Sequence, residues 1–109
     1  MPWHAHYFIL NEAHEPVEVT LDEWCRWRAA HATLKQTIIN QHARVTTRWH
    51  GMTDDVTMPG PPKYVHLLEG PGLKEKTADS LTYADALARH DRIAEWLRAR
   101  VKRYENPDS

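Results

Sequence analysis

The sequence predicts an α+β fold, in which a small antiparallel sheet (a three-strand meander plus an N-terminal hairpin or arm) packs against two helices, the longer one C-terminal. Two patterns carry this prediction. In the middle of the chain, apolar and polar residues alternate with period two, which is typical of half-buried antiparallel strands. Near the C-terminus, apolar residues recur at helical spacing. With 109 residues, the chain has the length of one domain, residues 1–109, and we expect residues 1–5 and 105–109 to be mobile.

The first elements are a strand pair and a short helix. The apolar run Tyr7–Leu10 and the alternating Val17–Val19 predict two strands, with turn-forming residues 11–16 between them. Thr20 followed by Glu23 matches a capping box, so a helix is expected over about 21–32. Helical spacing predicts that its buried face comprises Leu21, Trp24, Cys25 and Arg28, and that Trp27 lies off this face.

The central segment predicts the sheet. Residues 34–39 alternate, with Leu34, Gln36 and Ile38 on one side, and a turn follows at residues 40–41. Residues 42–50 alternate more sharply, and residues 63–69 are expected to form a third meander strand after a loop over 51–62. In the second of these strands we expect Ala43, Val45, Thr47 and Trp49 to be buried and His42, Arg44, Thr46, Arg48 and His50 to face water.

A long C-terminal helix is expected over about 83–104, with Thr82 as its N-cap and Asp85 three residues later. His90 falls on the apolar stripe, so we expect it to be buried and hydrogen-bonded to the backbone. The other members of the predicted stripe are Leu87, Ala94, Leu97, Val101 and Tyr104.

Composition excludes several classes of protein. Hydrophobic residues make up 41% and charged residues 27% of the chain, and the formal net charge is −1, so neither a disordered chain nor a strongly basic nucleic-acid binder fits. The longest apolar run has the length of a strand, so we expect no membrane association and a cytoplasmic location. The single Cys25 excludes an internal disulfide framework. No motif supplies a nucleophile, a base and an orienting group together, so we expect neither enzymatic activity nor a cofactor.

The predicted binding surface combines the wet face of the 42–50 strand with an adjoining acidic loop. Arginine and tryptophan dominate the energetics of many protein interfaces, and the loop adds negative charge. The residues of this surface are Arg44, Arg48, Trp49, His50, Asp54 and Asp55.

Two other sites stay open. Histidines at positions 4 and 6 would project from one face of a strand, and a returning hairpin could bring a third close, so His4, His6 and His14 form a candidate metal site of a metal-dependent hydrolase. A nucleic-acid interface would use Arg44 and Arg48 together with Arg98, Arg100 and Arg103 at the basic end of the last helix.

Three segments resemble a group of small, mostly uncharacterised proteins of bacteriophages and prophages. The group carries Ser/Thr-Thr-x-Phe-x-Gly-x-Asp-His, an aromatic-rich strand after a proline, and Thr-Trp-x-Glu-Ala-x-x-Gly-His, to which Thr46–Asp54, Pro62–Leu68 and Thr82–His90 are similar. The Asp-His of the group is replaced here by Thr53-Asp54, so a site formed by that pair is not expected in this chain. The resemblance implies an α+β fold, a phage origin, and binding to a host factor such as a component of antiviral defence.

Five tryptophans are more than a core of this size requires. Exposed aromatic side chains of that size usually mark an interface, so we also expect a homodimer.

Overall fold

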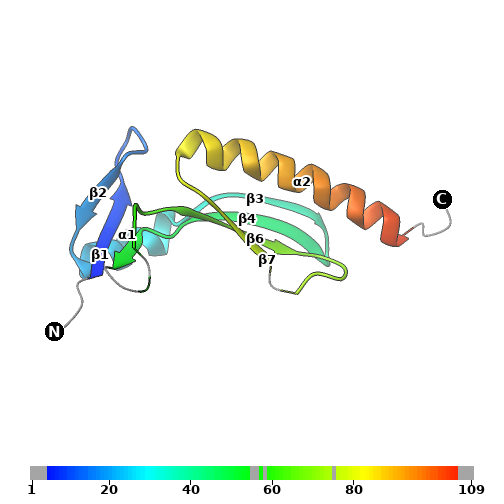
Figure 1. The fold of residues 1–109 in the computed structure, drawn as a ribbon, viewed down its shortest axis with the longest axis horizontal. Helices are drawn as coiled ribbons and strands as arrows, with labels where there is room; N and C mark the ends of the chain where they lie inside the picture. Colours follow the sequence, from blue (N-terminus) through cyan, green and yellow to red (C-terminus); the bar gives the residue numbers. More distant parts are fainter. Residues whose placement is uncertain (1–4, 55–56, 58, 75, 106–109) are drawn as a thin grey trace.

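The computed structural model describes residues 5–54, 57, 59–74 and 76–105. The chain ends expected to be mobile lie mostly outside this range, although Ala5 and Glu105 belong to regular structure. Within the described residues, no helix is long and apolar enough to span a membrane. The elements, in chain order (Figure 1), are β1 (Ala5–Leu10), β2 (Pro16–Val19), α1 (Leu21–His31), β3 (Thr33–Asn40), β4 (Ala43–Trp49), β5 (Met52–Asp54), β6 (Tyr64–Glu69), β7 (Lys76–Ser80) and α2 (Tyr83–Glu105).

The strands form two antiparallel sheets: the predicted N-terminal hairpin (β1 and β2) belongs to one, and the predicted three-strand meander (β3, β4 and β6) belongs to the other. One has the order β2-β1-β5 and the other the order β3-β4-β6-β7. The long helix α2 lies along one face of the four-stranded sheet, while α1 packs beside β1 at the far end (Figure 1). The α+β class, the antiparallel pairing and the long C-terminal helix are confirmed.

Gly51 joins the two sheets, because β4 ends just before it and β5 begins just after it. Its φ of 70° lies in the left-handed region that favours glycine. The Gly51 carbonyl accepts a hydrogen bond from Phe8 N at 2.7 Å, and the Trp49 indole donates to the Phe8 carbonyl at 2.8 Å. A Cβ at position 51 would lie 2.4 Å from the Phe8 oxygen. The absence of a side chain therefore lets β1 pass close to the β4–β5 junction.

Two strands were not predicted. The sequence of β5 lies in the segment expected to be a loop, and three residues are too few to show a period. The sequence of β7, Lys-Thr-Ala-Asp-Ser, is short of the β-branched and aromatic residues that favour strands. Pairing with β6 therefore decides the conformation of β7.

Helix α1 begins as predicted but faces a different way. Thr20 Oγ1 accepts a hydrogen bond from Glu23 N at 3.2 Å, which confirms the N-cap. Trp24 is buried and lies 5.0 Å from Tyr7 between ring centroids. Trp27, expected off the buried face, is half-buried and packs against the core. The prediction that Cys25 is buried is wrong, because the helix contacts the sheet through Trp24 and Trp27 and leaves Cys25 exposed.

Helix α2 also begins at its predicted cap, since Asp85 N donates to Thr82 Oγ1 at 3.1 Å. Its buried stripe is offset from the predicted one. Tyr104 was expected on the stripe but is 55% exposed, because α2 extends beyond the sheet there, and Leu87 is only half-buried. The buried residues are Ala86, His90, Ala94, Leu97 and Val101.

Strand β3 departs from simple alternation because the pairing with β4 shifts at each end, between Thr33 and Lys35 and between Ile38 and Asn40. Leu34 consequently packs against the core, whereas Ile38 is 66% exposed. Thr37 instead turns toward α2.

The core consists of two apolar clusters under α2. The cluster nearest α1 contains Leu10, Trp49, Tyr64 and Ala86, and the other contains Ala43, Leu97 and Val101. Between them along the helix lie the buried polar side chains Thr47, His66 and His90.

Candidate functional site

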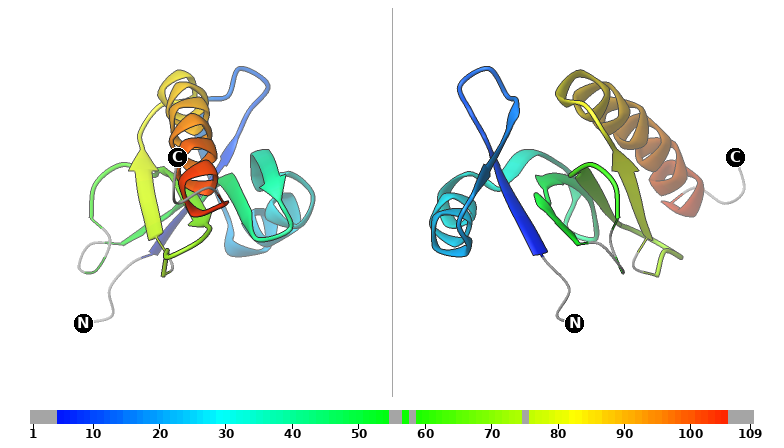
Figure 2. Two further views of the ribbon diagram at one scale, coloured as in Figure 1. Left: turned by 90° about the vertical axis from the view of Figure 1, so that its right-hand side faces the viewer. Right: turned by 60° about the vertical axis from the view of Figure 1, so that its left-hand side comes forward.

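Helix α2 lies over one face of the four-stranded sheet (Figure 2), and no other described helix or strand packs on the opposite face. Because directly paired residues of antiparallel strands share a face, the register identifies the side chains that point away from α2. Each of them is exposed or half-buried. We call this surface the open face; its residues are Thr33, Gln36, Ile38, Arg44, Thr46, Arg48, Val65, Leu67, Glu69, Thr77 and Asp79.

The open face carries apolar side chains on two of its strands. Val65 and Leu67 on β6 are half-buried, and Ile38 on β3 is 66% exposed. Strand β4 lies between them, and Ile38 is opposite Arg44 in the register. Burying apolar surface is favourable, so these side chains would gain from contact with a partner.

Two charged pairs lie on or beside the open face. Arg44 forms an ion pair with Glu69 on the neighbouring strand, and this hydrogen bond raises the pKa of Arg44 above its ordinary value. Lys63 Nζ lies 3.1 Å from Asp79 Oδ2. Among the described residues, Arg48 makes no hydrogen bond or ion pair. One arginine of the open face thus keeps its donors available.

His50 stands at the end of this strand beside three charged groups. Its backbone N donates to the Lys63 carbonyl at 3.0 Å. Burial lowers the pKa of His50, and the positive charges of Arg28 and Lys63 lower it further, while Asp79 acts in the opposite direction. Its Nε2 is buried without a hydrogen-bond partner in the structure. The imidazole is therefore neutral at pH 7 and adds no charge to the open face.

Two of the six residues of the predicted binding surface, Trp49 and Asp54, are buried, so their assignment to the surface is wrong. Trp49 is fully buried, with its ring centroid 4.7 Å from that of Tyr64, because it lies on the α2 side of β4. Asp54 is 2% exposed, and its Oδ1 accepts a hydrogen bond from Thr57 N at 2.5 Å. Asp55 lies outside the described residues. Of the predicted residues, Arg44, Arg48 and His50 remain on or beside the open face.

The structure does not bring the two described histidines of the candidate metal site together. His6 Nδ1 lies 3.0 Å from Glu18 Oε2 on the paired strand. His14 lies in the turn at the other end of β1, where its ring stacks on Tyr83 with centroids 3.8 Å apart. Within the described part of the chain, no group of three or more His, Cys, Asp or Glu could hold a metal ion. His4 lies outside that part.

The basic end of α2 is separated from the open face by the sheet. Arg98 pairs with Glu95 at 2.7 Å, and Arg100 donates to the Pro71 carbonyl at 2.8 Å while lying over the Trp96 ring. Arg103 is exposed. These three arginines belong to α2, whereas Arg44 and Arg48 lie on the face of the sheet turned away from α2. The five arginines of the candidate nucleic-acid interface therefore do not form one continuous surface.

The tryptophans also give less support to self-association than their number suggested. Trp24 and Trp49 are buried, Trp27 is half-buried and Trp3 lies outside the described residues. Trp96 is 42% exposed, as expected from its position off the main stripe. The homodimer remains a prediction and now rests on Trp96.

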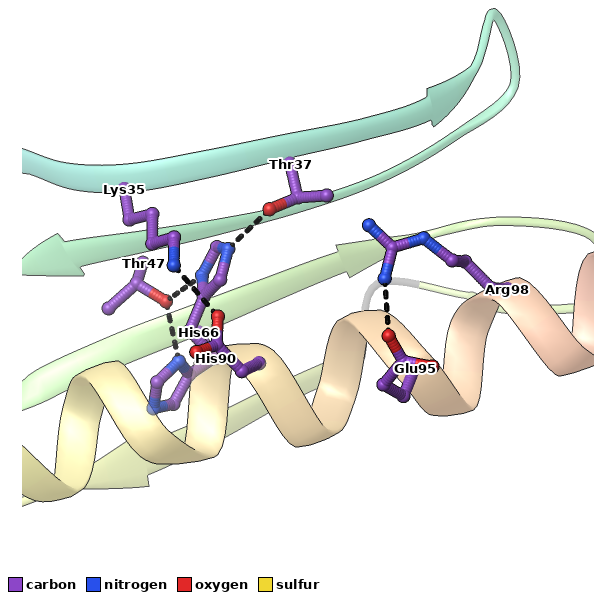
Figure 3. A network of polar contacts seen from close by, with 8 residues as sticks. Lys35, Thr37, Thr47, His66, His90, Glu95 and Arg98 are labelled. Atoms are coloured by element: carbon purple, nitrogen blue, oxygen red, sulfur yellow. Dashed lines mark hydrogen bonds and ion pairs between the residues drawn. The ribbon is translucent and has the colours of Figure 1, made fainter.

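A buried hydrogen-bonded chain of five polar side chains joins the sheet to the helix, and two of its members, Thr47 and His90, were expected from the sequence to be buried. Thr47 Oγ1 lies between two imidazoles, 2.7 Å from His66 Nδ1 and 2.6 Å from His90 Nδ1 (Figure 3). His90 Nε2 lies 2.8 Å from Thr37 Oγ1, and His66 Nε2 lies 2.8 Å from Ser80 Oγ. The five residues come from β3, β4, β6, β7 and α2, so one chain of contacts joins all four strands to the helix.

His90 is buried as predicted, but its partners are side chains and not the backbone. A helical backbone already bonds to itself, so a buried side chain there finds partners on the facing sheet. Thr47 was expected to be buried from its place in the alternation. The sequence therefore contained a signal of the Thr47–His90 contact. It placed a threonine on the buried face of a strand and a histidine on the apolar stripe of a helix.

The two imidazoles can be neutral with every nitrogen satisfied. In one arrangement, the Thr47 hydroxyl donates to His66 Nδ1, and His66 Nε2–H donates to Ser80 Oγ. His90 Nδ1–H then donates to Thr47 Oγ1, and His90 Nε2 accepts from the Thr37 hydroxyl. The arrangement in which every donor and acceptor is exchanged is equally consistent with the distances. Burial lowers the pKa of His66, and the charge of Arg89 lowers it further. Burial also lowers the pKa of His90, with Lys35 adding to the effect.

Ser80 and His66 have the geometry of a nucleophile and its base, but the third position differs. A carboxylate at the far nitrogen of the imidazole stabilises the charge that forms when the base takes a proton. Here that nitrogen contacts the uncharged hydroxyl of Thr47, and Ser80 is only 7% exposed. The arrangement orients side chains within the core, whereas the open face is available to a partner.

Comparison with known proteins gives no match to a family model, to a curated protein or to a solved structure.

Proposed function

We propose that this protein acts by binding another protein through the open face. The observation that carries the proposal is the sheet face turned away from α2, on which Ile38 of β3 is 66% exposed and Val65 and Leu67 of β6 are half-buried. Protein-binding surfaces usually combine such apolar side chains with polar and charged ones. Arg48, with no partner among the described residues, is the side chain placed to form a charged contact.

The charges favour a protein over a nucleic acid as the partner. Arg44 and Lys63 are neutralised by Glu69 and Asp79, two carboxylates that would repel phosphates. Affinity for nucleic acid comes chiefly from several cations that each contact a phosphate. Among the described residues of the open face, Arg48 is the cation without a carboxylate partner, and one cation is too few for such contacts.

The biological role follows from the resemblance to bacteriophage and prophage proteins. Small accessory proteins of phages often act on host factors, so we propose a host protein as the partner and inhibition of host antiviral defence as the role. The protein would then work in the cytoplasm of the bacterial host.

Affinity capture with the full chain tests this function. Ile38→Asp and Arg48→Glu alter exposed side chains of the open face, and Arg103→Glu is a control on the other layer. In nuclease-treated lysate of the bacterial host, we expect the wild type and Arg103→Glu to retain one stoichiometric protein partner and the two open-face variants to lose it. A second capture uses lysate without nuclease. Recovery of nucleic acid alone from it, with affinity falling roughly a thousandfold between 50 and 200 mM salt, would overturn the proposal in favour of nucleic-acid binding.

A further inference from the structure

A groove runs between the edge strand β7 and the flank of α2. In Figure 2, α2 lies over the sheet and β7 extends to one side of it. Two adjoining hollows, of about 310 Å³ and about 430 Å³, follow β7 and share Arg89 and Arg92 as lining residues. The groove is therefore as long as the strand.

Strand β7 is the last in the order of the four-stranded sheet, so no described strand pairs with its outer edge. Backbone groups on an exposed strand edge are ready to pair with an added strand. Arg89 Nη1 donates to the Asp79 carbonyl at 2.6 Å, which occupies the edge near its end. The stretch from Lys76 to Ala78 remains available for pairing.

The hollow beside this stretch is apolar on its floor and cationic on its rim. Its apolar lining comes from Leu68, Ala78, Ile93 and Trp96, of which Trp96 is 42% exposed. Its charged lining residues are all cations, Lys76, Arg89 and Arg92, whereas the second hollow also carries Asp79 and Asp85. Within the described residues, neither Lys76 nor Arg92 makes a hydrogen bond or ion pair. Such a hollow attracts a partner that is both acidic and apolar.

A second copy of this chain is a poor fit. A two-fold axis that pairs one β7 with another keeps both α2 helices on the same side of the extended sheet. The Arg89 and Arg92 side chains of the two copies would then approach one another. Like charges across an interface disfavour that pairing.

We propose that the groove binds an extended acidic peptide segment of a partner protein, which adds as a strand to β7 and places an apolar side chain beside Trp96. Strand addition obtains affinity from the backbone and specificity from alternate side chains. Here the apolar floor would take one side chain, and Lys76 and Arg92 would pair with acidic neighbours. The proposal uses neither Arg48 nor Ile38, so it stands or falls separately from the function proposed for the open face.

Synthetic peptides test it directly. The probe is a pool of hexapeptides in which Glu alternates with Leu, Ile, Val, Phe or Tyr, and the control pool carries Lys in place of Glu. We expect the acidic pool to shift the backbone amide NMR signals of residues 76–78 and the basic pool to leave them unchanged. Arg92→Glu should weaken binding about tenfold or more, while Arg48→Glu should bind as the wild type does.

Backbone methylation distinguishes strand addition from simple charge attraction. In an added strand, every second amide points at β7. Peptides N-methylated at odd or at even positions should therefore differ, with one set losing binding and the other retaining it. Equal binding by both sets, absence of binding by the acidic pool, or unaltered binding to Arg92→Glu would overturn the proposal. Concentration-dependent shifts of residues 76–78 without peptide would overturn it in favour of self-pairing.

Discussion

His66 on β6 and His90 on α2 share a single hydroxyl, since Thr47 Oγ1 lies 2.7 Å from Nδ1 of one and 2.6 Å from Nδ1 of the other. The hydroxyl has one proton, so it can donate to only one of the two nitrogens. If both imidazoles were charged, both Nδ1–H groups would point at the same oxygen and two buried positive charges would face one another. The arrangement therefore favours neutral histidines.

This relationship predicts that acid destabilises the fold. The pKa of both histidines is lowered in the folded chain from the ordinary value of 6.5, so below about pH 6.5 the unfolded chain binds more protons. The free energy of unfolding is therefore highest above about pH 6.5 and decreases as the pH falls toward the folded-state pKa values of the two histidines. Each histidine contributes a slope of at most about 1.4 kcal/mol per pH unit.

Urea unfolding at a series of pH values between 8 and 5 measures this effect. The midpoint should be constant at the upper end and fall below pH 6.5, and His66→Gln should reduce the slope. His42→Gln, which changes an exposed histidine, should retain it. Equal midpoints at pH 7.5 and pH 5 would contradict the prediction.

Thr47→Val should destabilise the protein much more than the same change one residue earlier. Valine retains the shape of threonine but removes the hydroxyl, which leaves two buried imidazole nitrogens without their partner. An unsatisfied buried polar group costs about 1–3 kcal/mol. Thr46→Val is the matched control, because Thr46 lies on the open face and bonds Gln36 at 2.9 Å near solvent. Similar unfolding free energies for the two variants would show that the shared hydroxyl contributes little.

The sequence predicted local elements better than their assembly. Thr20 and Thr82 cap the helices as expected, because capping depends on residues three positions apart. The face of α1 and the conformation of β7 depend on partners distant in the chain, Tyr7 and β6, and no local pattern encodes them. The division into two sheets at Gly51 likewise depends on the approach of Phe8 from the N-terminal strand.

The candidate site was predicted only where alternation decides it. Arg44 and Arg48 face water because β4 alternates, and the same alternation placed Trp49 on the buried side. Trp49 was nevertheless assigned to the binding surface because tryptophan is frequent in interfaces, and that assignment is wrong. The groove beside β7 was not predicted, because it requires knowing that β7 is an edge strand.

Gly51→Ala should be among the most destabilising single changes in the chain. An alanine Cβ would lie 2.4 Å from the Phe8 oxygen and 2.5 Å from Trp49 Nε1, so β1 and the β4–β5 junction would have to separate. Gly60→Ala is the control, because Gly60 also has a positive φ, of 97°, but a Cβ added there would meet no heavy atom within 4 Å. Backbone strain alone should cost Gly60→Ala roughly 1–2 kcal/mol. Calorimetry should show a much lower melting temperature for Gly51→Ala, and equal melting temperatures would mean that the close approach is not required.

Helix α1 should open locally at a lower free energy than α2. Trp24 is the buried residue of α1, and Leu21 is 48% exposed, whereas α2 buries five residues against the sheet. Elements with few buried contacts exchange their amide hydrogens through local opening, and core elements exchange only through global unfolding. Hydrogen exchange should therefore be faster for α1 than for the centre of α2.

Thr20→Ala removes a cap worth about 1 kcal/mol and should speed exchange in α1 while leaving α2 unchanged. Thr82→Ala removes the equivalent cap of α2 and should speed exchange throughout the four-stranded sheet, because α2 and that sheet unfold together. Equal acceleration of both helices by Thr20→Ala would show that α1 is part of the same cooperative unit.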